Sequence, residues 1–182
     1  MSRIQKQFTN EIVPKLKEVF KFSSVMQVPR LDKVVLNVGV GKSLKDAKHI
    51  EVVENTLIRI SGQRPVKTLA KKAISNFKTR KGLVVGLKVT LRGEKMYSFV
   101  EKLIHSTFPR IRDFRGLDQK SVDKYGNLNL GFKEHIAFPE IKSDEVEKIH
   151  GLQVTVSTTA KNREEGLELF KALGFPFVNT KE

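Results

Sequence analysis

A glycine-rich turn is the first segment of this sequence whose residue types could do chemistry. Gly39-Val40-Gly41-Lys42-Ser43 ends like a P-loop, whose backbone N–H groups cradle phosphate. The complete pattern needs a glycine five positions before Gly41, and Leu36 stands there. Nucleotide hydrolysis is therefore disfavoured, and two interpretations stay open: a plain tight turn, or a turn that approaches an RNA backbone.

Histidines are the other residues suited to acid–base or metal chemistry, because the chain has no cysteine. They show no His-x-x-x-His or similar metal-ligand spacing, and no Ser/His/Asp set is recognisable. Those on predicted helices are expected to be surface or packing residues. We therefore expect no metal and no cofactor, while a catalytic set that is assembled only in space stays open. The competing hypothesis is an RNA-processing enzyme, for which the only candidates are Asp113, His49, His105, His135 and His150.

Basic side chains form the strongest pattern in the chain. The net charge is +14, and residues 55–93 contribute +10 of it through ten basic and no acidic residues. A solvated surface usually mixes both signs, so this segment predicts a surface for a polyanion, with a merely solubilising basic face as the alternative. Its densest part is a projecting loop at about residues 70–82, expected to be an exposed loop or loose hairpin between two strands. The loop offers positive charge, hydrogen bonds and one ring that could stack: Lys71, Lys72, Ser75, Asn76, Phe77, Lys78, Arg80 and Lys81.

A second basic segment is Arg110-Ile111-Arg112-Asp113-Phe114-Arg115-Gly116. Three arginines flank a phenylalanine there, and the segment fits no simple amphipathic period. We interpret it as a contact surface for RNA or protein, and a turn with a buried Phe114 is the alternative.

The elements that must position these residues follow from apolar periodicity, which is helical in some segments and strictly alternating in others. In chain order we expect a helix at 4–21 bent at Pro14, a strand at 34–40, a helix at 46–60, and strands at 65–69 and 83–92. A helix at 94–107, closed before Pro109, and short strands up to Phe138 follow. The last elements are a short helix from Ser143 to Gly151, a strand at 152–157, and a helix that an Asn162/Glu165 capping box opens and that runs to Gly174.

These elements predict one α+β domain over residues 1–182, with a partly antiparallel sheet and helices packed on one face. Alternation along the strands places polar side chains on the other face, where a folded RNA could bind. They are Lys33, Asn37, Lys88, Thr90, Arg92, Gln153, Thr155 and Ser157.

No segment approaches the roughly 18 apolar residues that a membrane span needs, and the N-terminus leads into mixed charge instead of an apolar signal core. We therefore expect a soluble, cytoplasmic protein. A module that binds anionic membranes is a further alternative, and it would need a contiguous basic amphipathic helix, which the sequence lacks.

Five stretches of the sequence resemble a known family. They are Val28–Asn37, Gly62–Pro65, Ala73–Lys78, Pro109–Gly116 and Phe138–Ile141. In this order and spacing they resemble the L-five family of bacterial large-subunit ribosomal proteins, and the resemblance runs from the first helix to Gly174-Phe175-Pro176-Phe177.

The resemblance implies a structural protein of the central protuberance without catalytic activity. It implies that 5S rRNA binds the polar sheet face and adjoining turns, a set made up of Arg30, Lys33, Asn37, Gln63, Arg64, Lys88, Thr90 and Arg92. The eight residues of the basic loop named above would reach the elbow of P-site tRNA. Further implied partners are 23S rRNA, neighbouring central-protuberance proteins and the small-subunit protein S-thirteen, with no membrane and no homo-oligomer. The implied bridge to the small subunit consists of Arg110, Arg112, Asp113, Phe114 and Arg115.

Overall fold

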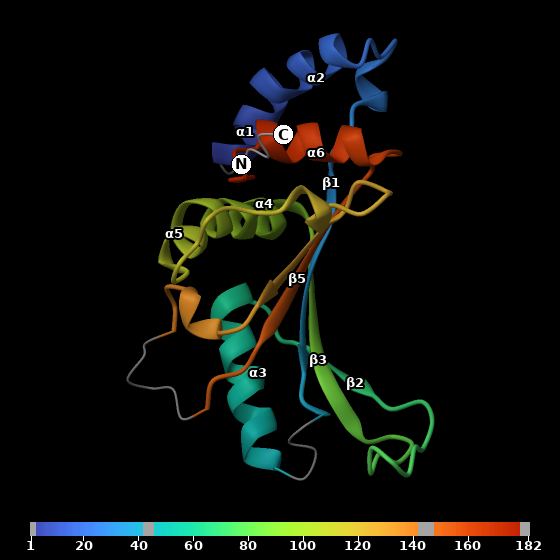
Figure 1. Ribbon diagram of the computed structural model, residues 1–182, viewed down its shortest axis with the longest axis vertical. Coiled ribbons are helices and arrows are strands. Elements are labelled where there is room, and N and C mark those ends of the chain that lie inside the picture. Colours follow the sequence, from blue (N-terminus) through green and yellow to red (C-terminus); the bar gives the residue numbers. More distant parts are fainter. Residues whose placement is uncertain (1–2, 42–45, 142–147, 179–182) are drawn as a thin grey trace. The chain divides into compact units, whose positions relative to one another are not determined.

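The computed structural model describes residues 3–41, 46–141 and 148–178 (Figure 1). Lys42 and Ser43 of the glycine-rich turn lie outside the described residues, as does most of the helix expected from Ser143. The described elements are α1 (Arg3–Gln7), η1 (Phe8–Ile12), α2 (Val13–Val19), η2 (Val25–Gln27), β1 (Leu31–Gly39), α3 (Ala47–Ser61), β2 (Val66–Leu69), β3 (Val84–Leu91), α4 (Gly93–Lys102), η4 (Leu103–Thr107), α5 (Phe108–Arg110), η5 (Gln119–Ser121), β4 (Leu128–Phe132), η6 (His135–Ala137), β5 (Leu152–Thr158) and α6 (Arg163–Ala172).

A five-stranded sheet in the order β2-β3-β1-β5-β4 forms the centre of the fold. β2 and β3 pair antiparallel, with Val66 opposite Lys88 and Thr68 opposite Gly86. Gly86 has to be a glycine, because a Cβ there would lie 2.9 Å from both Thr68 Oγ1 and the Val38 carbonyl oxygen. The predicted α+β class is confirmed.

Alternation along the strands decides which side chains enter the core. Alternate apolar residues are fully buried on three strands, and the residues between them are half-buried or exposed. Such a period of two is expected of strands that bury only one face. The buried set is Val34, Leu36 and Val38 on β1, Leu87, Val89 and Leu91 on β3, and Leu152, Val154 and Val156 on β5.

The chain divides into two compact units, each made of separate segments. The first unit comprises Met1–Val34, Leu91–Leu130 and Thr155–Glu182, and the second comprises Val35–Thr90 and Gly131–Val154. The expectation of one domain over residues 1–182 stays a prediction.

In the second unit, α3 begins and ends where the sequence predicts. The Asp46 carboxylate accepts a hydrogen bond of 3.2 Å from the His49 backbone N–H and caps the helix. Gly62 ends it with a φ of 63°, the left-handed conformation that favours glycine. The buried face of α3 includes Val53, Leu57 and Ile60.

In the first unit, the chain is helical from Arg3 to Val19, which confirms the first predicted helix. Pro14 does not end it, because the π-helical stretch η1 just before it changes the backbone hydrogen-bond pattern, so that the missing N–H is tolerated. The same holds at Pro109, so the expected stop before this residue is wrong: the helical path continues from Gly93 through η4 to Arg110. Both prolines follow a π-helical stretch.

Two smaller expectations also need correction. After β4 the chain forms a short 3-10 helix, η6, instead of further strands up to Phe138. The Asn162 side chain makes no capping hydrogen bond to α6, and the Glu165 carboxylate instead accepts a hydrogen bond of 2.9 Å from the Lys161 backbone N–H. Among the described residues, no helix has the length and apolar character needed to cross a membrane.

Candidate nucleic-acid interface

The polar face of the second unit includes side chains of β1 and β3. On β3, Lys88 is exposed and Thr90 is half-buried, whereas their neighbours Leu87 and Val89 are buried. Asn37 on β1 is half-buried between two fully buried neighbours, Leu36 and Val38. The strands therefore direct the Lys88 ammonium, the Thr90 hydroxyl and the Asn37 amide towards solvent, as the alternation predicts.

The turn after α3 brings Gln63 to the same strand. The Ser61 hydroxyl accepts from the Gln63 backbone N–H at 3.2 Å and donates to the Leu57 carbonyl at 2.6 Å, which fixes the turn. The Gln63 side-chain amide then donates a hydrogen bond of 3.3 Å to the Thr90 carbonyl oxygen. The structure thus brings together two residues of the predicted RNA-binding set, which are 27 positions apart in the sequence.

Glu54 is a charged residue of this region that sequence reasoning missed. Its carboxylate lies 3.3 Å from both Arg64 Nε and Lys67 Nζ. Burial alone would raise the pKa of Glu54, but the hydrogen bonds from Lys67 and Arg64 outweigh it and lower that pKa below its ordinary value. Two of the ten cations in the carboxylate-free segment are therefore paired with the acid that immediately precedes it. The Arg64 side chain remains 84% exposed, so it is still accessible to a partner.

The first unit contains the other three residues of the predicted 5S set. Arg30 and Arg92 are exposed. Lys33 is half-buried and forms an ion pair of 3.3 Å with Asp32. Burial raises the pKa of Tyr97, and the positive charge of Arg30 opposes this shift. The backbone of Arg30 is held in place by Thr159: the Arg30 N–H donates to the Thr159 hydroxyl at 3.0 Å, and the Arg30 carbonyl accepts from the Thr159 N–H at 2.9 Å.

The segment from Ala70 to Gly82, called the basic loop below, is an exposed hairpin extension between β2 and β3. Two hydrogen bonds close its base, from Ala70 N–H to the Leu83 carbonyl and from Gly82 N–H to the Ala70 carbonyl. An isolated bridge between Ile74 and Thr79 orders its tip. Phe77 is 70% exposed, and all five cations of the loop are exposed as well. The basic loop is thus an exposed hairpin that presents the Phe77 ring between positive charges.

In the arginine-rich segment Phe114 packs against the core, as the alternative interpretation expects, whereas the contact with RNA or protein stays a prediction. The Phe114 ring stacks on the buried ring of Phe108, with centroids 5.2 Å apart and planes within 12°. Phe114 is therefore a packing residue that anchors the turn. Arg110, Arg112 and Arg115 are exposed around it. Asp113 is also exposed and adopts a φ of 55°.

Three of the four histidines come together in the second unit, which their spacing did not predict. The rings of His135 and His150 stack with centroids 3.8 Å apart, and His49 approaches His150 edge-on at 6.3 Å. The His150 backbone N–H donates to His135 Nδ1 at 3.3 Å. Burial, followed by the charges of His135 and His49, lowers the pKa of His150 to about 4. Burial also lowers the pKa of His135.

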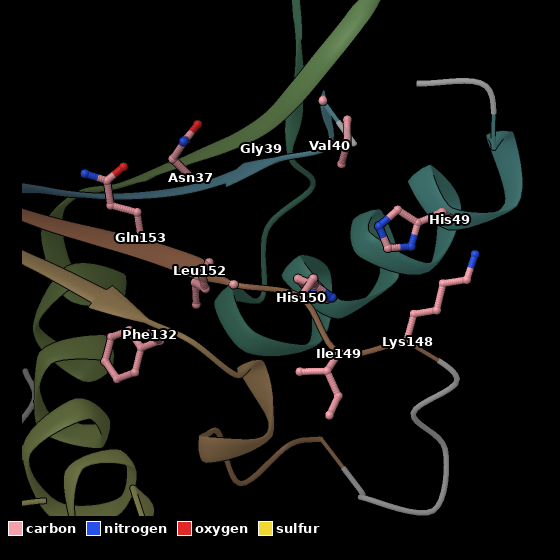
Figure 2. A pocket seen from close by; sticks show the side chains of 12 residues that line it. Asn37, Gly39, Val40, His49, Phe132, Lys148, Ile149, His150, Leu152 and Gln153 are labelled. Atoms are coloured by element: carbon pink, nitrogen blue, oxygen red, sulfur yellow. The ribbon is translucent and has the colours of Figure 1, made fainter. Parts of the chain in front are cut away.

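These histidines border a pocket (Figure 2). Gly39 and Gly41 of the glycine-rich turn line it together with His49 and His150. Within the part of the chain that the structure describes, no group of three or more metal-ligating side chains could hold a metal ion. Local spacing could not have revealed this cluster, because positions 49, 135 and 150 meet only through the fold.

Comparison with known proteins places these surfaces in context. Residues 24–80 match the family described as Ribosomal protein L5, and residues 84–177 match the family that describes the C-terminus of the same ribosomal proteins. A protein of Halothermothrix orenii named Large ribosomal subunit protein uL5 is 52% identical over 177 residues, covering 97% of this chain and 99% of the relative. Proteins of the same name from Streptococcus thermophilus strain LMD-9 and Desulforamulus reducens are 49% and 46% identical, with 97% and 98% of this chain and 98% of each relative covered.

Proposed function

Because this chain belongs to the ribosomal protein L5 family, we propose that it binds 5S rRNA through the polar side chains of its sheet and the turn after α3. As a member of this family it is a structural, non-enzymatic constituent of the large ribosomal subunit, and it acts in translation in the bacterial cytoplasm. The observation that carries the RNA proposal is the strict alternation on β3, which buries Leu87 and Val89 and exposes Lys88.

Each polar residue of the second unit has a chemistry suited to RNA. Lys88 and the exposed Arg64 would contact phosphates. The Thr90 hydroxyl and the Asn37 amide can both donate and accept, so they would bind 2′-hydroxyl groups or base edges. The Gln63 side chain bonds to the Thr90 backbone and would thereby fix the positions of these side chains relative to one another. In the first unit Arg30, Lys33 and Arg92 would add further phosphate contacts.

The basic loop would contact the P-site tRNA. Its five exposed cations, Lys71, Lys72, Lys78, Arg80 and Lys81, attract a phosphate backbone. Ser75 and Asn76 supply hydrogen bonds beside the exposed Phe77 ring, which could stack on an accessible base. Reversing the charges at Lys71, Lys72 and Lys78 is expected to weaken tRNA contact and to spare 5S rRNA binding.

The arginine-rich segment would form the bridge to the small subunit. The stacked pair of Phe108 and Phe114 fixes the turn, so that Arg110, Arg112 and Arg115 would face an acidic partner surface. We assign small-subunit protein S-thirteen as this partner. 23S rRNA and the neighbouring proteins of the central protuberance would contact other exposed parts of the chain.

Salt dependence of binding tests the 5S rRNA proposal. Neutralising about six phosphates should lower the affinity for 5S rRNA by roughly 10³ between 50 and 200 mM salt. The affinity is measured by filter binding or fluorescence anisotropy with a 5S rRNA transcript and with a length-matched unrelated RNA. An affinity for 5S rRNA that does not change with salt concentration would contradict the proposal. An affinity equal to that for the unrelated RNA would contradict it as well.

A further inference from the structure

The pocket beside the histidine cluster has a volume of about 780 Å³, and all of its lining residues belong to the second unit. His49 comes from α3, and His150 from the chain just before β5 (Figure 2). Val40, Phe132, Ile149 and Leu152 supply apolar lining. The pocket therefore combines apolar walls with a few polar groups, the composition typical of sites for planar organic ligands.

His150 has the most unusual environment in this pocket. The residue is only 9% exposed; its ring forms one hydrogen bond with the Lys148 backbone, which leaves the other ring nitrogen without a partner. His49 Nδ1 is likewise buried without a partner. Because buried polar atoms are normally hydrogen-bonded, two such atoms at one pocket, one on each imidazole, point to a ligand that completes them. A neutral imidazole offers one donor and one acceptor, which matches the mixed donors and acceptors of a nucleobase edge.

Charge at the pocket argues against a phosphate group as the ligand. Lys148 is the cation among the described lining residues, and its Nζ lies 2.9 Å from Asp46 Oδ2. The Asp46 carboxylate also caps α3, so it compensates the positive end of the helix as well. The charge of Glu134 acts on His135 at the same cluster. A neutral aromatic ring fits this balance better than an anion.

We propose that this pocket holds one nucleobase, unstacked from the RNA strand that the polar face binds. The inference rests on the proposed function, because the same strands serve both. Asn37 on β1 and Gln153 on β5 also line the pocket, and in Figure 2 their side chains leave the two strands on the same side. Figure 2 also shows that Asn37 and Gln153 point away from His49 and His150, so an RNA strand that crosses this face would have to insert its unpaired base past the ends of β1 and β5 to reach the two imidazoles.

Two measurements on the full-length chain test the pocket. The first records the imidazole nitrogen signals of protein labelled with ¹⁵N-histidine, during titration with a 5S rRNA transcript, adenosine and uridine 5′-monophosphates, and inorganic phosphate. We expect the His49 and His150 signals to shift with 5S rRNA, and inorganic phosphate to leave them unchanged. The exposed His105 is the internal control.

The second measurement compares 5S rRNA affinity among His150→Phe, the matched control His105→Phe and Lys88→Ala. His150→Phe keeps a ring for the stack on His135 and removes both ring nitrogens, so it should fold, which thermal unfolding verifies. We expect it to weaken binding roughly tenfold, the effect of one lost base-edge contact, and His105→Phe to have no effect.

The outcomes separate this inference from the proposed function. If Lys88→Ala weakens 5S rRNA binding and His150→Phe leaves it unchanged, the pocket proposal is overturned and the proposed function is kept. Signals that shift with mononucleotides but not with 5S rRNA would overturn RNA as the source of the base. A wild-type chain that does not bind 5S rRNA would overturn the proposed function, and the pocket with it.

Discussion

The Gln63 side-chain amide donates a hydrogen bond of 3.3 Å to the carbonyl oxygen of Thr90 and so joins the turn after α3 to β3. This contact ties the end of a helix to the strand that carries Lys88 and Thr90. The turn contributes Gln63 and Arg64, and the strand contributes the alternating polar residues. This hydrogen bond and the pairing of β2 with β3 together join the two parts of the proposed RNA-binding set of the second unit.

Replacing Gln63 by alanine should lower the free energy of unfolding by about 1 kcal/mol, because one half-buried hydrogen bond is lost. Gln153→Ala removes the same side-chain type at an exposed position and should have little effect on stability. Chemical denaturation of the two variants and the wild type measures the difference. Equal stability of all three would show that the contact with Thr90 contributes nothing.

Glu54→Gln should strengthen RNA binding while slightly destabilising the fold. The substitution removes the charge that pairs with Arg64 and Lys67, so both cations become available to phosphate. The Glu54 side chain is only 12% exposed, but a glutamine there can keep a hydrogen bond from the exposed cations, so the cost to stability should be about 1 kcal/mol. Glu51→Gln, an exposed position on the same helix, is the control. A Glu54→Gln variant with unchanged affinity for RNA and unchanged salt dependence would contradict this role for Glu54.

His150 makes stability depend on pH. Its pKa is about 4 in the folded chain against an ordinary value of 6.5, so the unfolded chain binds the proton more readily. The stabilisation is present above pH 6.5 and is lost as the pH falls towards 4, by on the order of 3 kcal/mol. Unfolding by denaturant between pH 7 and pH 4 should therefore show an unfolding free energy that falls with falling pH. His150→Phe should reduce this dependence, and His105→Phe should retain it. An identical dependence in all three proteins would exclude His150 as its source.

Close backbone packing in the first unit makes Gly166 sensitive to any side chain. A Cβ at this position would lie 2.5 Å from Gly126 Cα and from the Gly126 carbonyl oxygen, both of which are backbone atoms that yield little. Gly166→Ala should therefore lower the unfolding free energy by about 1–3 kcal/mol. At Gly131 a Cβ would have no neighbour within 4 Å, so Gly131→Ala is the matched control. A Gly166→Ala variant that melts at the wild-type temperature would refute the steric argument.

Strands and exposed loops could be predicted from the sequence because their signals are local. The alternation of Leu87, Lys88 and Val89 reports burial directly, and the run of cations without acids in the basic loop indicates exposure. Helix ends were less predictable, because a π-helical stretch allows the path to continue through Pro109. Contacts between distant segments left no local signal. Only the fold could show that Glu54 compensates Arg64 and Lys67.

The most direct test of the central claim is the affinity of the double variant Asn37→Ala/Thr90→Ala for 5S rRNA at moderate salt. Both side chains are half-buried polar groups on the proposed interface, and neither carries charge. The account predicts a loss of at least about tenfold with little change in the salt slope, because directional hydrogen bonds are removed and phosphate contacts remain. A double variant that binds 5S rRNA as tightly as the wild type would contradict the assignment of this interface.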